Sequence, residues 1–370
     1  MKVRRRLLRL LAIAVLAMVA AFAVLFVRTV GWTEPLPENS TLACHRLDGP
    51  VGAEDIAIDW PAGRAYVTSA DRHGVNTGTA PRGDIFVLDF AAATPALTPL
   101  KLRDDDAFFP HGLDLWTGPG GAKRLFIVDH GADGLSHSIE IYDITQDGAL
   151  SLAQSVSASA LTSPNDVATS GPEQFYASND PFAEPAWKRW LETYLLLPLN
   201  TLAYFDGRRA MPVAEGLQFP NGVALSPDGQ WLIVAESTAR ALRLFRRNPF
   251  NGQVTPDRSI RVPMAPDNIT VQPDGALMVA GHPRPLAFQA HARAPAAAGA
   301  PSMVLRITDW TGDKPRIDTL FADDGQRFAA SSVAFRDPRG RLFIGGVYER
   351  GLLMCGGGAQ SMVSPATDIR

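Results

Sequence analysis

The sequence predicts an all-β protein, a six-bladed β-propeller, preceded by an N-terminal hydrophobic anchor helix. Three observations predict it: an apolar run near the start, a hairpin-like phrase that recurs six times, and 32 Gly and 29 Pro among 370 residues, which indicate many turns. With 46% hydrophobic and 20% charged residues, the composition excludes a disordered, collagenous or coiled-coil protein. We divide the chain into residues 1–31, a signal anchor or signal peptide, and residues 32–370, the propeller domain.

The first segment predicts export and membrane attachment. Residues 10–27 are 18 consecutive apolar residues that follow a cluster of Lys and Arg, which fits a spanning helix with its N-terminus in the cytoplasm. Arg28 directly after this run favours an uncleaved anchor, whereas the small residues around Ala21 and Ala23 leave cleavage as a signal peptide open. In either case we expect the propeller outside the cytoplasm, periplasmic or extracellular, attached through residues 10–27 or secreted after cleavage.

Charge and cysteine usage narrow the partners and the compartment. The net charge is −3, and because residues 1–28 carry six basic and no acidic side chains, the remainder carries −9, which makes nucleic acid an unsuitable partner. The two cysteines, Cys44 and Cys355, form neither a CxxC zinc pattern nor a dense disulfide framework. Export would let them pair and hold the two ends of the ring together; two unpaired buried thiols are the alternative.

The repeated phrase consists of a polar pair, alternating hydrophobic residues, a Pro/Gly turn and a second hydrophobic run, the pattern of a β-hairpin. Its starts lie 46 to 64 residues apart, which leaves room for about four short strands in each unit. The six copies are EDIAIDWPAGRAYVT from Glu54, HGLDLWTGPGGAKRLFIV from His111, NDVATSGPEQFYAS from Asn165, NGVALSPDGQWLIVA from Asn221, DNITVQPDGALMVA from Asp267 and SSVAFRDPRGRLFIG from Ser331.

Two segments interrupt the repeat. Residues 182–199 have a helix-like apolar face, which we expect to lie over one end of the ring. Residues 285–301 are rich in Ala and Pro and predict a mobile insertion.

The polar pairs predict a cation site. If the six units are equivalent, their first residues meet at one mouth of the central channel, where a set of acids and carboxamides without Lys or Arg would repel unless cations lay between them. Such oxygens suit Ca²⁺ better than Zn²⁺. Because neighbouring strand residues point to opposite faces, two ions are expected; ordinary turn residues are the alternative. The set is Glu54, Asp55, His111, Asn165, Asp166, Asn221, Asp267, Asn268 and the step Ser331–Ser332.

Several of these motifs are long and contiguous, among them GAEDIAID, FPHGLDL, SPNDVATSGPEQFYASND, FPNGVALSPDG, PDNITVQPDG, GHP and SSVAFRDPRGRLFIGGVYERGLLMC. Together they resemble the serum paraoxonase/arylesterase family over residues 42–355. The resemblance implies a six-bladed propeller with two Ca²⁺ in its tunnel, a retained leader, a disulfide between Cys44 and Cys355, and hydrolysis of lactones, aryl esters and, in some members, organophosphates.

The resemblance also implies two ligand sets. The catalytic Ca²⁺ would be held by Glu54, Asn165, Asn221, Asp267 and Asn268. The structural Ca²⁺ would be held by Asp55, Asp166 and the backbone carbonyl of Leu113.

The same resemblance assigns the catalytic and pocket residues. Water would attack a carbonyl that Ca²⁺ polarises, with His111 taking the proton and His130 orienting His111; two structural histidines are the alternative. Asp180 would act as acid or base, or serve as a turn residue before Pro181. The substrate pocket would be lined by His282, Phe219, Val347 and His73; the last stands where the family commonly has an aromatic residue, and Pro181 where it commonly has His.

The sequence leaves three functions open. The first is a calcium-dependent hydrolase of lactones and aryl esters, which acts on a small-molecule ester or lactone. The second is a non-enzymatic ligand-binding propeller with structural calcium, for which titratable groups beside the ion would have no use. The third is a gluconolactonase-like enzyme with one divalent ion, in which Asp55 and Asp166 would be unpaired acids. A GxSxG elbow is absent from the sequence, which disfavours a serine hydrolase.

Overall fold

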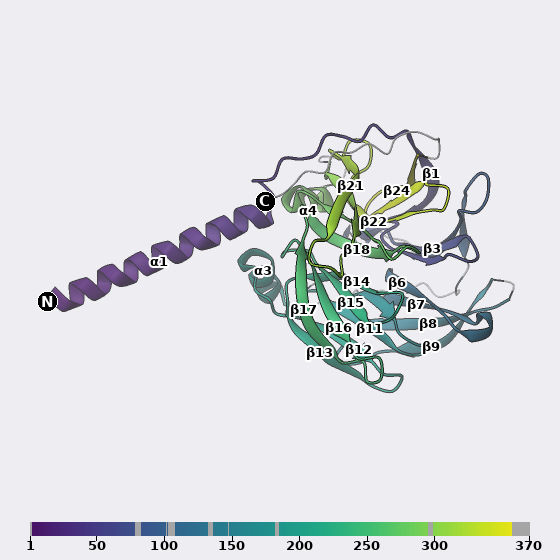
Figure 1. The fold of residues 1–370 in the computed structure, drawn as a ribbon, viewed down its shortest axis with the longest axis horizontal. Helices are drawn as coiled ribbons and strands as arrows, with labels where there is room; N and C mark the ends of the chain where they lie inside the picture. The colour runs from purple at the N-terminus through teal and green to yellow at the C-terminus, as the bar shows by residue number, and fades with distance from the viewer. Residues whose placement is uncertain are drawn as a thin grey trace.

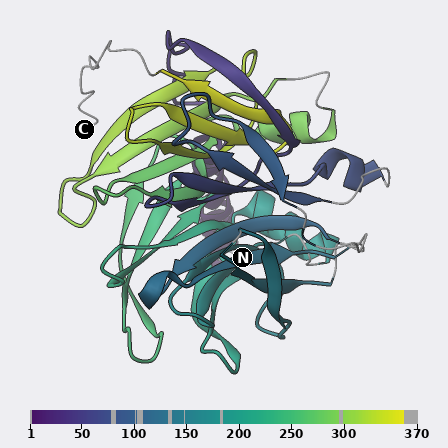
Figure 2. The ribbon, with the colours of Figure 1, turned by 90° about the vertical axis from the view of Figure 1, so that its right-hand side faces the viewer.

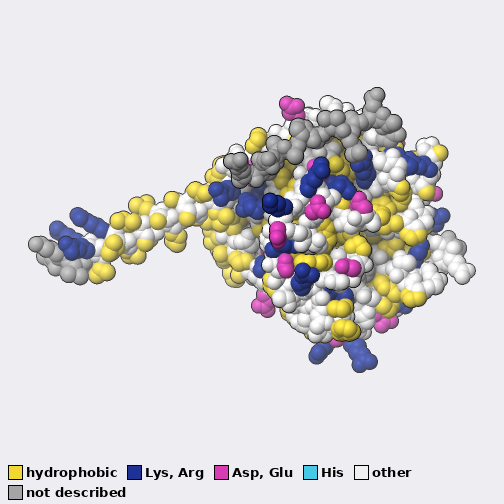
Figure 3. Space-filling view, viewed as in Figure 1, with side chains coloured by type: hydrophobic (Ala, Val, Ile, Leu, Met, Phe, Trp, Pro, Cys, Tyr) yellow, Lys and Arg dark blue, Asp and Glu magenta, His cyan; other side chains and the backbone are white. Residues whose placement is uncertain are grey.

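The computed structural model describes residues 2–77, 83–100, 102, 108–131, 136–146, 148–181, 185–294 and 299–356. It begins with helix α1, Lys2–Thr29, which projects from the propeller (Figure 1). Its residues Arg5–Thr29 are long and apolar enough to cross a membrane, and none of that stretch is buried. Between the basic side chains at its free end and the propeller, apolar side chains cover the helix (Figure 3), as expected of a candidate anchor.

The remainder of the described chain forms six four-stranded antiparallel sheets around a common centre (Figure 2), which confirms the predicted propeller. Listed from the axis outward, the first blade contains β2 (Ile56–Asp59), β3 (Arg64–Ser69), β4 (Asp84–Asp89) and β5 (Leu97–Leu100), and the second contains β6 (Pro110–Thr117), β7 (Lys123–Asp129), β8 (Ser138–Ile144) and β9 (Leu150–Val156). The third contains β10 (Pro164–Thr169), β11 (Phe175–Asn179), β12 (Asn200–Phe205) and β13 (Ala210–Leu217), and the fourth contains β14 (Pro220–Leu225), β15 (Trp231–Glu236), β16 (Ala241–Arg247) and β17 (Val254–Arg261). The fifth contains β18 (Ala265–Val271), β19 (Leu277–His282), β20 (Ser302–Thr308) and β21 (Arg316–Asp323), and the sixth contains β22 (Ser331–Arg336), β23 (Leu342–Gly346), β24 (Arg350–Cys355) and β1 (Cys44–Val51).

The ring closes where the first strand joins the last blade. Strand β1 pairs with β24 in a register that sets Cys44 opposite Cys355, and these two cysteines form a disulfide across 311 residues of sequence. Apolar side chains of the first and sixth blades pack together across this closure, including Ile56, Val333 and Phe335. The predicted pairing of the cysteines is therefore confirmed.

The polar pairs of the repeat lie in β-bulges of the inner strands. In β6, β10, β14 and β18, two residues oppose one residue of the neighbouring strand, just after the Pro that is the first or second residue of the inner strand. A bulge leaves its residues outside the regular ladder and re-aims their side chains. The bulged pairs are His111–Gly112, Asn165–Asp166, Asn221–Gly222 and Asp267–Asn268.

Glycine in two of these bulges permits close packing of neighbouring inner strands. A Cβ at Gly112 would lie 2.5 Å from Asp166 Cα, and a Cβ at Gly222 would lie 2.7 Å from Asn268 Cα. Both distances are shorter than real Cβ contacts, so any other residue would push the inner strands apart.

Three further helices lie outside the sheets: α2 (Arg72–Thr77), α3 (Ala186–Leu195) and α4 (Pro285–Arg293). Helix α3 confirms the helical pattern within 182–199; it lies on the side from which α1 projects (Figure 1), with Trp187 and Trp190 exposed. The prediction of a mobile insertion over 285–301 is wrong for 285–293, because Pro285 at the first turn and good helix formers after it give α4, which packs on the propeller. Residues 182–184 and 295–298 lie outside the described residues.

The turn after α1 is fastened to the propeller by two arginines. The buried guanidinium of Arg240 donates to Glu34 Oε2 at 2.5 Å and to the carbonyl of Thr29 at 3.4 Å. Arg284 donates to the carbonyls of Gly31 and Glu34, the latter at 2.6 Å. Residues 29–34 are therefore part of the folded domain, and we call them the juxtamembrane turn.

Replacing both Cys44 and Cys355 by Ser should lower thermal stability, because the unfolded chain regains the freedom that the cross-link removes. In the chain-entropy model the loss reaches up to about 5 kcal/mol. Thermal unfolding followed by circular dichroism, with and without reductant, measures it. Equal melting temperatures of the oxidised wild type and the variant would contradict the role of this bond.

Deleting residues 1–34 should destabilise the propeller, whereas deleting residues 1–28 should leave its stability unchanged. Only the longer deletion removes the carboxylate and carbonyls of residues 29–34. Arg240 then keeps the carbonyls of Pro263 and Pro283 but loses its ion pair with Glu34, and breaking such a pair costs up to about 3 kcal/mol. Denaturant unfolding of the two truncated proteins makes the comparison. Equal unfolding midpoints would show that the juxtamembrane turn is dispensable.

Candidate functional site

The mouth of the channel brings together the side chains that the bulges carry. Glu54 precedes β2 and reaches Asn268 of β18: Asn268 Nδ2 donates to Glu54 Oε1 at 2.9 Å and to the Glu54 carbonyl at 3.0 Å. Ser332 closes the other side, its Oγ donating to the same carbonyl at 2.7 Å. Asn268 and Ser332, which follow Glu54 by 214 and 278 positions in the sequence, thus contact it in the fold, as the repeat predicts.

Four oxygens of this mouth are buried without a hydrogen-bond partner: Glu54 Oε2, Asn165 Oδ1, Asn221 Oδ1 and Asn268 Oδ1. The amide nitrogens of Asn165 and Asn268 are both engaged, with Asp180 Oδ2 at 2.9 Å and with Glu54, so the amide oxygens are the atoms left over. Buried unsatisfied oxygens are costly and rare in native proteins. A hard cation that takes carboxylate and carboxamide oxygens would satisfy all four.

The charge balance of the mouth points the same way. Burial raises the pKa of Glu54 to about 8, with Asp267 and Asp55 adding to the rise and Arg72 opposing it. Among the described residues, no three His, Cys, Asp or Glu side chains gather closely enough to hold a metal ion. Amide-rich oxygen sets fit Ca²⁺ and not Zn²⁺.

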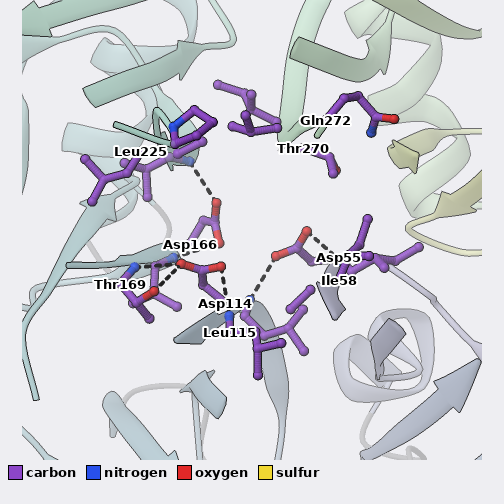
Figure 4. Close-up of a pocket in the computed structure, with 18 of the residues that line it drawn as sticks. Asp55, Ile58, Asp114, Leu115, Asp166, Thr169, Leu225, Thr270 and Gln272 are labelled. Atoms are coloured by element: carbon purple, nitrogen blue, oxygen red, sulfur yellow. Dashed lines mark hydrogen bonds between the residues drawn. The ribbon is translucent and has the colours of Figure 1, made fainter. Parts of the chain in front are cut away.

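A second group of acids lines a cavity between the inner strands (Figure 4). Asp55 Oδ2 accepts the N–H of Leu113 at 2.8 Å, and Asp166 Oδ2 accepts the N–H of Val223 at 2.7 Å, so each carboxylate joins its inner strand to the next. Burial raises the pKa of Asp55 to about 6, and burial together with the charge of Asp55 raises the pKa of Asp166 well above its usual value. Both line a cavity of about 410 Å³ with Asp114.

Leu113 contacts Asp55 through its backbone N–H, whereas the family resemblance implies that its backbone carbonyl binds the structural Ca²⁺. The N–H donates to Asp55 because the bulge at His111–Gly112 turns the backbone that follows it. The role of the carbonyl as an ion ligand stays a prediction.

A row of histidines borders the mouth. His111 Nδ1 lies 2.7 Å from His130 Nε2, and His130 Nδ1 lies 2.9 Å from His137 Nδ1. His111 Nε2 lies 3.7 Å from Glu54 Oε1. Burial, then the charge of Arg72, lowers the pKa of His111 well below its usual value, and burial with the neighbouring His137 lowers that of His130 to about 3. Both imidazoles are therefore neutral near pH 7.

Two residues of this site were missed from the sequence. Arg72 of α2 places Nη2 3.7 Å from Glu54 Oε2, so the mouth contains a basic residue although the polar pairs contain none. His137 stands just before β8. Neither belongs to the repeated phrase; the spacing of seven positions from His130 to His137 was the signal available that both could lie in one blade.

The pocket residues of the sequence analysis are placed as follows. Asp180 is buried, and its two carboxylate oxygens accept hydrogen bonds from Ser163 Oγ at 2.7 Å and Asn165 Nδ2 at 2.9 Å; its role as acid or base stays a prediction. His282 Nε2 lies 3.0 Å from Asp267 Oδ2, and its ring stacks on Phe288 of α4 with centroids 3.9 Å apart.

The other three pocket residues lie on connecting segments. His73 follows Arg72 in α2, Val347 is buried after β23, and Phe219 precedes β14 with a positive φ of 50°. Their roles in binding a substrate stay predictions.

Comparisons with known proteins give the family. The family model named Arylesterase matches residues 39–356. Serum paraoxonase/arylesterase 1 is 30% identical over 84% of this chain and 87% of its own length in Mus musculus, with the same values in Homo sapiens. Serum paraoxonase/lactonase 3 of Mus musculus is 28% identical over 92% of this chain and 96% of its own length.

Solved structures share the fold at low identity. A gluconolactonase from Xanthomonas campestris has a TM-score of 0.50 and 18% identity over 87% of this chain and 98% of its own. Regucalcin from Agrobacterium tumefaciens, described as a calcium-binding protein, has a TM-score of 0.51 and 13% identity over 85% and 94%. The family match over most of the chain and the paraoxonase relatives confirm the resemblance seen in the sequence: the chain belongs to the arylesterase family of hydrolases.

Proposed function

We propose that this protein is a calcium-dependent hydrolase of lactones and aryl esters. The observation that carries the proposal is the set of four buried, unsatisfied oxygens beside a hydrogen-bonded pair of neutral histidines. The printed names of the relatives, arylesterase, lactonase and paraoxonase, support the substrate class. The residues proposed to hold the catalytic ion are Glu54, Asn165, Asn221, Asp267 and Asn268.

In the proposed hydrolysis, the ion and the side chains have different roles. Bound Ca²⁺ would polarise the substrate carbonyl and stabilise the oxyanion. His111 would accept the proton of the attacking water at Nε2, the nitrogen that faces Glu54, because its Nδ1 is engaged with His130. Asp180 would hold Asn165 with its oxygen toward the mouth, and His282 would hold Asp267.

A second, structural ion is proposed at Asp55 and Asp166, with the carbonyl of Leu113. The support is electrostatic: burial raises the pKa of both acids, and the charge of Asp55 raises that of Asp166 as well. A cation beside the two carboxylates would favour their charged forms. This pair distinguishes the proposal from a propeller with one divalent ion. The neutral histidine pair beside the mouth distinguishes it from a binding propeller, which needs no such base.

We also propose that α1 anchors the protein in a membrane with the propeller outside the cytoplasm. The disulfide between Cys44 and Cys355 suits an oxidising compartment. The contacts of Arg240 and Arg284 with the juxtamembrane turn support retention of the segment that follows the helix.

Removal of calcium should abolish hydrolysis of phenyl acetate and of a γ- or δ-lactone, and added Ca²⁺ should restore it.

Asn221→Leu, which removes one unsatisfied oxygen at nearly constant volume, should weaken Ca²⁺ binding about tenfold or more in isothermal titration. Asn251→Leu, on an exposed turn between β16 and β17, is the matched control. Activity that persists in excess EGTA would contradict the mechanism.

His111→Gln should lower kcat for ester and lactone hydrolysis by about 10²-fold or more while leaving Ca²⁺ affinity intact, because the general base is lost and the proposed ligands remain. His45→Gln, on the exposed part of β1, serves as the control. Steady-state kinetics and calcium titration are measured on both variants. Loss of the metal from the His111 variant would assign that residue a structural role.

A further inference from the structure

A third histidine extends the pair at the mouth. The two rings that flank His130 stand nearly edge-on to it, each with its centroid 4.9 Å away, at interplanar angles of 61° for His111 and 87° for His137. Both nitrogens of His130 lie within hydrogen-bond distance of another imidazole nitrogen, at 2.7 and 2.9 Å. The three rings form one hydrogen-bonded row.

The second blade holds all three histidines. His111 stands in the bulge of β6, His130 directly follows β7, and His137 directly precedes β8. The backbone of His137 is held by Ser157, whose Oγ donates to the His137 carbonyl at 3.2 Å. The row therefore rests on the paired strands β6, β7 and β8, and it runs from Glu54 at the mouth to the half-buried His137.

Proton counting fixes the tautomers that catalysis requires. Each hydrogen bond between two neutral imidazoles holds one proton. For His111 Nε2 to accept a proton, its Nδ1 must carry hydrogen and donate to His130 Nε2. His130 must then carry hydrogen on Nδ1 and donate it to Nδ1 of His137, whose own hydrogen is on Nε2.

We propose that His137 is a positioning residue for hydrolysis: it selects the tautomers of His130 and His111 and completes a three-imidazole proton relay. The proposal rests on the proposed function, in which His111 is the base. As water attacks, its proton goes to His111 Nε2, the proton of His111 Nδ1 passes to His130 Nε2, and that of His130 Nδ1 passes to His137 Nδ1. His111 and His130 end neutral with reversed tautomers, and His137 ends protonated; the reverse sequence returns the proton to the leaving alkoxide.

Two substitutions separate tautomer selection from proton relay. His137→Leu removes both, so kcat should fall about 10²-fold with little change in KM or in Ca²⁺ affinity. His137→Asn offers an oxygen that accepts from His130 but passes no proton, so it should recover part of the lost kcat. His45→Leu, on exposed β1, is the control, and thermal unfolding shows that each variant is folded.

A spectroscopic measurement tests the positioning without any assay. In ¹⁵N-labelled wild-type protein, the histidine ring shifts should show His111 protonated at Nδ1; His137→Leu should give mixed tautomers of His111 and His130, and His137→Asn should restore the wild-type pattern. If the tautomers follow this pattern but the wild type hydrolyses no ester or lactone, the positioning stands and the proposed function fails. Unchanged ring shifts in folded His137→Leu, or kcat equal to that of wild type, would overturn the inference.

Discussion

The candidate site depends on one backbone device, the two-for-one bulge near the start of the inner strands. In a regular strand, consecutive side chains point to opposite faces, so a polar pair would be divided between the two sides of the blade. The bulges at Asn165–Asp166 and Asp267–Asn268 lift both residues out of the ladder. One member can then meet the mouth, while the carboxylate of Asp166 reaches the amide of the next inner strand.

Several carboxylates are buried close together in the channel, which is electrostatically unfavourable. The bulge in β10 brings Asp166 into the channel, where Glu54 and Asp55 also lie just before β2, and burial raises the pKa of all three carboxyl groups. Arg72 offsets part of the charge at Glu54, but its closest approach is 3.7 Å, beyond a hydrogen bond. Amide oxygens left unsatisfied around the same carboxylate add a second cost that a cation of high oxygen coordination would relieve. A bound cation would lower both costs, that of the buried carboxylates and that of the unsatisfied amide oxygens. The proposal for calcium therefore follows from the arrangement of these oxygens.

The sequence predicted the parts of the structure that repeat. Six copies of one phrase predicted the blades, and equivalence of the copies predicted that Glu54, Asn165, Asn221 and Asn268 share one mouth. It missed what depends on connecting segments: Arg72 comes from a helix after β3, and His137 from the turn before β8, where spacing carries no periodic signal. The role of the Leu113 amide was missed because a bulge cannot be read from hydrophobic alternation. Residues 285–293 were misjudged because Ala, and Pro in the first turn, also suit a helix that packs on the propeller.

The attachment of the N-terminal segment reaches the site through a short chain of contacts. Arg240 donates to the carbonyl of Pro283 as well as to the juxtamembrane turn, and Pro283 directly follows His282, which holds Asp267. The next residue, Arg284, contacts the same turn and precedes α4, whose Phe288 stacks on His282. The turn, the segment 282–284 and α4 are thus connected by hydrogen bonds and by the stacking of two rings. These contacts link the segment that follows α1 to the residues that hold Asp267 at the mouth, so a change at Arg240 would be felt on both sides.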